Sequence, residues 1–452
     1  MADRTRLPVA DADAPFVFPI IRKSRLSTGL SLWYVPHATV PVTTMVLLVR
    51  AGSSADPVER PGLASLTGDM LDEGAGDRSA IEVHEALAGI GAQFDTEVGA
   101  DATFLTLTTL TKFTDVGLAL LSDLAARPRF DDGEFARVRE LRANRLRQLR
   151  DVPSATADRA FATALYGRHP YGHLAIGTID ALEQMRVGDV RRFHQSRYHP
   201  ANAVLVVVGD EPQDIVVGRV ERAFNAWATG GALSEAVPFA PPAPPSDRLV
   251  IVNRERAPQS ELRVGHLGVS RQTPDYHALV VANLVLGGQF VSRLNMNLRE
   301  HRGLTYGARS WFEFRLEPGP FQMSASVQTP ATADAIAEMM REVRDLRGAR
   351  PITQTELDTA RATLTRGYPR NFETADQLAR SVAQLALYNL PDDYFSRFVP
   401  TVAALGLADV QAAAAAHLDP DRLLAVVVGD TGQVVPSLSA LGLGAAVEVA
   451  PA

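Results

Sequence analysis

The pattern of hydrophobic and polar positions switches along the chain between a period of two and a helical period of three to four residues. Alternating or continuous short apolar runs predict strands, and apolar residues three or four apart predict helices. The first half is predicted to hold two short strands within 16–36, a strand at 43–51, helices at 62–72 and 81–91, a strand hairpin at 93–111, and helices at 113–126, 131–149 and 178–197. The arginine and glutamate spacing of the 131–149 helix predicts a solvated face.

The second half repeats this order of elements. Strands are predicted at 248–253 and 261–269, a helix at 276–287, a hairpin at 306–329, and helices at 332–348, 353–366, 374–388 and 391–404. The residues repeat as well, because the segment 197–210 reappears as 417–430, with Pro200 and Pro420 lying 220 positions apart. A repeat of whole elements in the same order indicates two copies of one structural unit.

A proline-rich segment separates the two copies. Residues 229–247 contain Gly230-Gly231 and the pairs Pro241-Pro242 and Pro244-Pro245. Proline cannot continue a helix and stiffens an extended chain. We therefore expect an N-terminal half at 1–228, a linker at 229–247 and a C-terminal half at 248–452. Strands in runs with helices between them predict an α+β fold of two tandem homologous halves, each a mixed β-sheet covered by helices on one face.

The composition narrows the class of protein only in part. The 452 residues are 46% hydrophobic and 21% charged, and the net charge of −7 argues against a nucleic-acid partner. The absence of cysteine excludes disulfides and thiolate catalysis. No apolar run approaches the roughly 18 residues that cross a membrane, and the N-terminus has no apolar signal core. We expect a cytoplasmic protein, or a periplasmic one if a signal peptide has been removed.

One stretch, Gly62 to Gly74, resembles the metal-binding helix of the pitrilysin/insulinase family of zinc metallopeptidases, the inverzincins. The family reads His-x-x-Glu-His where this chain has Ser65-Leu66-Thr67-Gly68-Asp69. The resemblance places Ser65 and Asp69 at two zinc-ligand positions and Gly68 at the position of the general base. The third ligand position falls near Asn144-Arg145, where an arginine would repel a cation. A catalytic zinc needs three protein donors and an open site, so we expect no metal on this chain.

A second stretch matches another signature of the same family. It runs from Gly287-Gly288 through Ser292-Arg293-Leu294 and on to Arg299 and Tyr306. The resemblance implies that Arg299 holds a backbone carbonyl of a bound peptide and that Tyr306 donates a hydrogen bond to the oxyanion of the tetrahedral intermediate. Gly287 and Gly288 would form a gate loop, while Gln289 and Arg293 would be structural or gate residues. The competing interpretation is that Arg299 pairs with Glu300 or a nearby carboxylate and that Tyr306 only begins a strand.

The two signatures together imply a function. Some members of the family are built from two chains, of which one carries zinc and the other supplies the arginine and tyrosine. We therefore expect a non-catalytic subunit that is inactive alone. It would bind no cofactor itself, pair with a zinc-bearing homologue, close a peptide chamber and hold the peptide substrate as an added strand. The alternative is a structural scaffold with no role in proteolysis, like the core proteins of the bc1 complex. A peptidase active alone conflicts with Ser65, Gly68 and Asp69.

Overall fold

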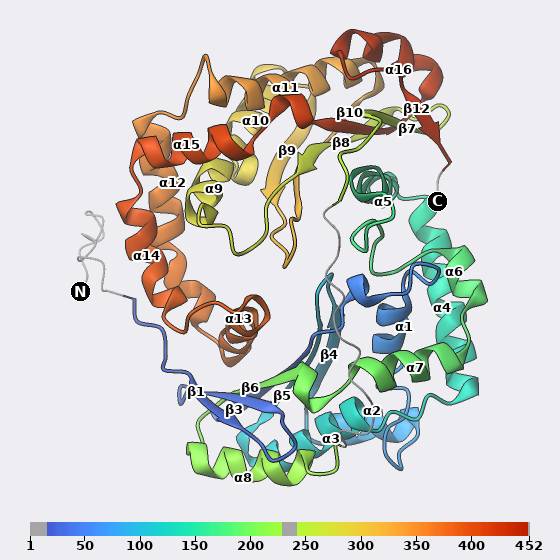
Figure 1. Cartoon of the computed structure of the whole chain (residues 1–452), viewed down its shortest axis with the longest axis vertical. Coiled ribbons are helices and arrows are strands. Elements are labelled where there is room, and N and C mark those ends of the chain that lie inside the picture. Colours follow the sequence, from blue (N-terminus) through green and yellow to red (C-terminus); the bar gives the residue numbers. More distant parts are fainter. Residues whose placement is uncertain (1–15, 228–241, 451–452) are drawn as a thin grey trace, which may run out of the picture.

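The computed structural model describes residues 16–227 and 242–450, which form two halves that face each other (Figure 1). The first half is built on a six-stranded mixed sheet in the order β1-β2-β6-β3-β5-β4, in which only β2 and β6 pair in parallel. Its strands are β1 (Arg22–Arg25), β2 (Ser31–Pro36), β3 (Val42–Val49), β4 (Gln93–Val98), β5 (Thr103–Leu110) and β6 (Ala203–Gly209). Its helices are α1 (Leu63–Asp69), α2 (Ala80–Gly89), α3 (Thr114–Ala126), α4 (Asp132–Arg150), α5 (Pro153–Tyr166), α6 (Ile179–Gln184), α7 (Val187–Arg197) and α8 (Gln213–Phe224).

The second half repeats the plan with the strand order β12-β7-β11-β8-β10-β9. Its strands are β7 (Leu249–Asn253), β8 (Gln259–Leu267), β9 (Thr305–Phe312), β10 (Pro320–Gln328), β11 (Leu424–Gly429) and β12 (Val447–Val449). Its helices are α9 (Tyr276–Asn283), α10 (Arg293–Asn295), α11 (Thr332–Arg347), α12 (Gln354–Arg366), α13 (Ala375–Tyr388), α14 (Tyr394–Ala404), α15 (Leu407–His417) and α16 (Thr431–Leu438). The predicted α+β fold of two tandem halves with mixed sheets is confirmed.

The described residues test the predicted linker only in part. Residues 228–241 lie outside the described part of the chain, and 242–247 lead into β7 without regular structure. The predicted boundaries at 228 and 248 therefore stay predictions, although the strands of the first sheet all precede residue 228 and those of the second all follow residue 248.

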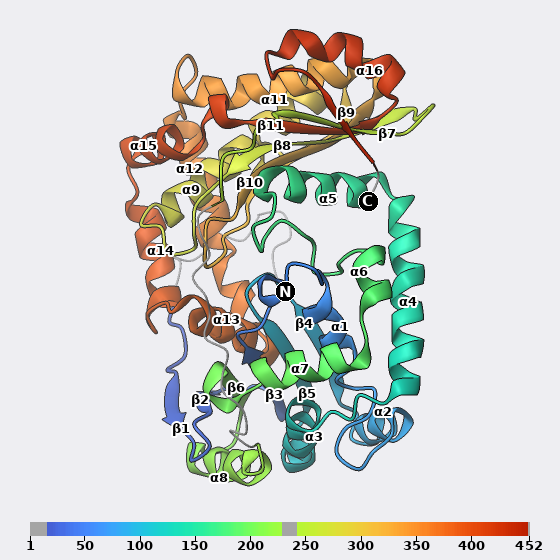
Figure 2. The same cartoon turned by 45° about the vertical axis from the view of Figure 1, so that its right-hand side comes forward.

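Each sheet has a second face, opposite the helices of its own half, and this face carries one helix that belongs to the other half. Helix α5 of the first half packs on β8 and β11 of the second sheet, and α13 of the second half packs on β3 and β6 of the first (Figure 2). Phe161 and Leu165 of α5 are buried together with Val250, Leu424 and Val426. The two helices occupy equivalent places in the repeat, so the exchange is reciprocal. It covers the middle strands on the second face of both sheets and ties the halves together.

Helix α5 is also the main element that the hydrophobic pattern did not predict. Its signals are a proline at its first position, Pro153, and apolar residues at Ala157, Phe161 and Leu165. They are weak because alanine and threonine fill the positions between them. The predicted helix 178–197 is in fact two helices, since the chain turns at Met185 and Arg186 between α6 and α7.

The stretch Tyr276–His301 is long and apolar enough to cross a membrane, with a mean hydropathy of 1.2 in its most apolar window. It joins α9, a π-helical turn at 284–288, α10 and a second π-helical turn at 296–301. Half of that window is buried inside the protein. Leu279, Leu286, Leu294 and Leu298 belong to the core of the second half, so the apolar side of this stretch is used in internal packing.

Candidate functional site

Helix α1 is held at its N-terminus by a buried carboxylate. Asp56 accepts hydrogen bonds from the backbone N–H groups of Gly62 (2.7 Å) and Ala64 (2.6 Å), and His173 Nε2 lies 3.0 Å from it. Burial raises the pKa of Asp56 to about 7, against the opposing effect of the backbone N–H groups and of Arg142. Burial also lowers the pKa of His173. Gly62 has a φ of +99°, which favours glycine.

An arginine binds both of the residues that the resemblance assigns to zinc-ligand positions. Nη2 of Arg142, from α4, donates to Ser65 Oγ (2.8 Å) and to the carboxylate of Asp69, and Nη1 donates to the carbonyl of Ile176 (3.1 Å). The Arg142 side chain is only 6% exposed. The two positions predicted as vacant ligand sites are therefore brought together by α1, and both are used to bind a guanidinium.

The predicted third ligand position lay near Asn144-Arg145, but the residue that reaches α1 is Arg142, one turn earlier on α4. Asn144 and Arg145 are exposed. The hydrophilic pattern of α4 indicated a solvated face and gave no signal that one arginine of that face points inward. A guanidinium beside both ligand positions does not fit a zinc ion. Among residues 16–227 and 242–450, no group of three or more histidine, cysteine, aspartate or glutamate side chains is arranged to hold a metal.

The base position is closed by packing. A Cβ atom on Gly68 would lie 2.9 Å from Val98 Cγ2 and 3.2 Å from Thr96 Cγ2, both on β4. This contact explains a glycine in the middle of a helix, where it costs about 1 kcal/mol relative to alanine. A pocket of about 620 Å³ remains beside it, lined by Asp69, Arg142 and Arg145 among others. The pocket therefore opens beside both predicted ligand positions, and no histidine lines it.

The arginine and tyrosine of the second signature lie on the other half. Arg299 is in the helical turn at 296–301, with its Nε 3.2 Å from Glu300 and its guanidinium 4.7 Å from the ring centroid of Phe290. Tyr306 is the second residue of β9, the edge strand of the second sheet, and it is 91% exposed. No hydrogen bond or ion pair joins either residue to α1 in the part of the chain that the structure describes.

The predicted gate loop packs tightly against β9. A Cβ atom on Gly287 would lie 2.4 Å from Ser310 Oγ, and one on Gly288 would lie 2.9 Å from Asn283 Nδ2. Both glycines therefore allow close contact between the loop and its surroundings. Gln289 follows them, and its Oε1 accepts a hydrogen bond from Thr363 at 3.3 Å.

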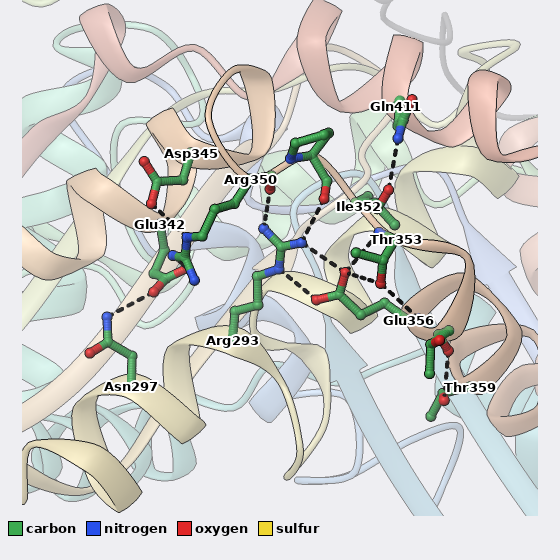
Figure 3. A network of polar contacts seen from close by, with 12 residues as sticks. Arg293, Asn297, Glu342, Asp345, Arg350, Ile352, Thr353, Glu356, Thr359 and Gln411 are labelled. Atoms are coloured by element: carbon green, nitrogen blue, oxygen red, sulfur yellow. Dashed lines mark hydrogen bonds and ion pairs between the residues drawn. The ribbon is translucent and has the colours of Figure 1, made fainter.

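A network of polar contacts anchors the helical segment that carries Arg299 (Figure 3). Arg293 binds both carboxylate oxygens of Glu356, at 2.6 and 2.7 Å, and Asn297 donates to buried Glu342 at 2.8 Å. Arg350 donates to the other oxygen of Glu342 at 2.7 Å. Burial acts to raise the pKa of Glu356, but hydrogen bonds from Arg293 and Thr353 outweigh it and lower the pKa to about 2. The segment is thereby fixed to α11 and α12.

The fold and the site define a class of protein with two peptidase-like halves, in which an arginine binds both positions that the resemblance assigns to zinc ligands. Comparison with known proteins identifies the family of the two halves. Residues 34–178 match the family model Insulinase (Peptidase family M16), and residues 184–364 match the model Peptidase M16 inactive domain. The chain belongs to peptidase family M16, as the resemblance of its two signatures implied.

The relatives are named both as zinc proteases and as non-peptidases, and one similar solved structure is named an inactive domain. The non-peptidase homolog YmxG of Helicobacter pylori is 22% identical over 405 residues, which cover 88% of this chain and 91% of that protein. A peptidase M16 inactive domain from Pseudomonas fluorescens has a TM-score of 0.84 at 26% identity, covering 91% and 98% of the two chains. A chain of complex III2 from Candida albicans shares the fold, with a TM-score of 0.77 at 12% identity over 94% and 100%.

Proposed function

We propose that this chain is the non-catalytic subunit of a heteromeric zinc peptidase and that it supplies Arg299 and Tyr306 to an active site whose metal is on a homologous partner. The proposal rests on a difference between two places, the predicted ligand positions on α1 and the pair of Arg299 and Tyr306. Arg142 binds both positions that the resemblance assigns to zinc ligands, whereas Tyr306 is 91% exposed on an edge strand. A large aromatic side chain that is almost fully exposed gains nothing from internal packing.

The surroundings of Tyr306 suit an extended peptide. Among the described strands, β9 pairs only with β10. On its other side, the Asn295 and Asn283 side chains already bind the Ala308 N–H and the Ser310 carbonyl, so the backbone around Tyr306 is the part that an added strand would pair with. A tyrosine hydroxyl beside that edge can donate to the oxygen on which negative charge develops during peptide hydrolysis. Arg299 lies on a segment that the Arg293 and Asn297 contacts fix in place, and its fork of donors suits a peptide carbonyl.

The test combines this chain with a homologue that carries His-x-x-Glu-His and follows the cleavage of an unstructured peptide. Tyr306→Phe is expected to lower kcat by roughly 10²–10³ because it removes one donor to the developing oxyanion. Arg309→Gln is the matched control, since Arg309 is an exposed residue of the same strand. Sedimentation of both variants with the partner verifies assembly. Full activity of Tyr306→Phe in an assembled complex would refute the proposed role.

One observation favours a scaffold role instead. Arg299 already contacts the carboxylate of Glu300 and the ring of Phe290, so its charge is partly satisfied without a peptide. A scaffold would assemble with its partner and show no loss of activity in either Tyr306→Phe or Arg299→Met. Glu300→Gln separates the two roles as well, because freeing Arg299 would change the KM for the peptide only if Arg299 contacts it.

A further inference from the structure

A pocket of about 600 Å³ lies in the second half among α9, α12, α13 and α14. Its volume is in the range of small-molecule sites. Six aromatic side chains line it, among them Tyr276, Tyr368 and Tyr394. It shares none of its lining residues with the pocket beside α1, and it includes neither Arg299 nor Tyr306.

The pocket is positively charged. Its lining includes Arg271, Arg370 and Arg380 and no aspartate or glutamate. Arg380 is neutralised, because it lies 3.1 Å from Asp376 and 3.4 Å from Glu97. Neither Arg271 nor Arg370 forms an ion pair with any carboxylate in residues 16–227 and 242–450. Two of the three positive charges are therefore left without an anion.

Arg271 is the more unusual of the two, because it is only 9% exposed. Its guanidinium lies 3.6 Å from the ring centroid of Tyr276 and 4.8 Å from that of Tyr394. Such contacts attract a cation, but they do not replace the carboxylate that normally accompanies a buried charge. A buried arginine at the wall of an open pocket is a favourable place for an anion that enters from solvent.

A buried hydroxyl group also lacks a partner. Tyr368 is 7% exposed, and its hydroxyl forms no hydrogen bond with any described residue. Burial raises its pKa, so the group stays protonated and available as a donor at neutral pH. Its ring stacks on Phe398 at 4.4 Å between centroids, which fixes its orientation. Unpaired buried donors are uncommon in native proteins and call for a partner.

We propose that this pocket binds a small aromatic carboxylate. The ring of the ligand packs among the aromatic side chains, and its carboxylate binds Arg271 and Arg370. Aromatic walls favour a planar ring, and the guanidinium fork matches the two oxygens of a carboxylate. The required chemistry is one negative charge joined to one ring, present either in a free acid or in a peptide that ends in phenylalanine.

The test titrates the full chain with 3-phenylpropionate by calorimetry and uses 3-phenylpropanamide as the neutral analogue. We expect saturable binding of the acid, with the amide weaker by about 10- to 100-fold because it cannot form the ionic hydrogen bonds. Arg271→Met is expected to weaken binding of the acid by about 10- to 100-fold and Arg370→Gln by about 10-fold. Arg397→Gln is the control, since Arg397 is an exposed arginine of α14 that does not line the pocket.

A pocket-filling variant keeps the test decisive if Arg271→Met fails to fold. Gln384 is exposed and lines the pocket, so Gln384→Trp should block the acid while the melting temperature is unchanged. A peptide ending in phenylalanine is titrated in parallel, and tighter binding of the peptide than of the free acid identifies a chain end as the ligand. The proposal is overturned by equal affinity for acid and amide, by unchanged binding in Arg370→Gln and Gln384→Trp, or by no binding up to about 10 mM.

Discussion

The contact of Arg142 with α1 gives the sharpest prediction for stability. Replacing Arg142 with methionine keeps most of the apolar stem but removes the donors to Ser65, Asp69 and the Ile176 carbonyl. A hydrogen bond to a charged group contributes about 1.5–3 kcal/mol. The Asp69 side chain is 49% exposed, so water can hydrate the carboxylate that is left behind. We expect Arg142→Met to lower the free energy of unfolding by about 2 kcal/mol.

Removing the charge of the other partner, Asp69, should lower the free energy of unfolding by more. Asp69→Asn leaves the guanidinium of Arg142, only 6% exposed, without its carboxylate, and an uncompensated buried charge is strongly destabilising. We expect a loss of about 3 kcal/mol. The double variant then costs less than the sum of the single ones, because the residues in direct contact depend on each other.

The assay is urea unfolding of the two single variants, the double variant and Arg145→Met, followed by circular dichroism. Arg145 is the matched control, since it lies three residues further along α4, is exposed and lines the same pocket. We expect Arg145→Met to change the free energy of unfolding by no more than about 0.5 kcal/mol. If Arg142→Met were as neutral as this control, or if the effects of the variants were additive, the guanidinium would not hold α1 as described.

Two further predictions concern stability. Nδ1 of His266 lies 2.9 Å from the carbonyl of Leu267, and its Nε2 accepts a hydrogen bond from the N–H of Asp419 at 3.2 Å. These contacts fix the neutral ring, and burial lowers the pKa of His266 to about 4. This stabilisation is complete above the unfolded pKa of about 6.5 and is lost as the pH falls toward 4. The free energy of unfolding, measured with urea, should therefore fall between pH 7 and pH 5 by about 2 kcal/mol less in His266→Gln than in the wild type. An unchanged pH dependence of the variant would contradict this prediction. Phe161→Ala should lower the free energy of unfolding by about 3–5 kcal/mol in the same assay, because the ring is 2% exposed where α5 packs on the second sheet. Phe290→Ala is the control and should be nearly neutral, since Phe290 is 61% exposed. Similar effects of the two variants would count against the exchange of α5 and α13 as a source of stability.

The sequence by itself determined most of the fold. Helical and strand periods depend on neighbouring residues, so they predicted β3, α1, α11 and most other elements to within a few residues. The repeat 220 positions apart predicted two copies of one unit, and the signatures around Gly62 and Arg299 predicted the family. The sequence also shows directly that Ser65, Gly68 and Asp69 stand where the family has its two histidines and its glutamate.

Only the tertiary structure showed which residue binds the predicted ligand positions Ser65 and Asp69. Arg142 lies 73 residues from Asp69, and nothing in the local pattern of α4 distinguishes it from the exposed arginines beside it. The exchange of α5 and α13 could not be predicted either, because an apolar face predicts that a helix is buried but not which sheet it packs against. The same holds for Arg271, whose missing carboxylate becomes visible only when three helices bring tyrosine rings around it. Periodicity is a local property of the chain, whereas charge pairing and the choice of packing partner depend on residues that are far apart in sequence.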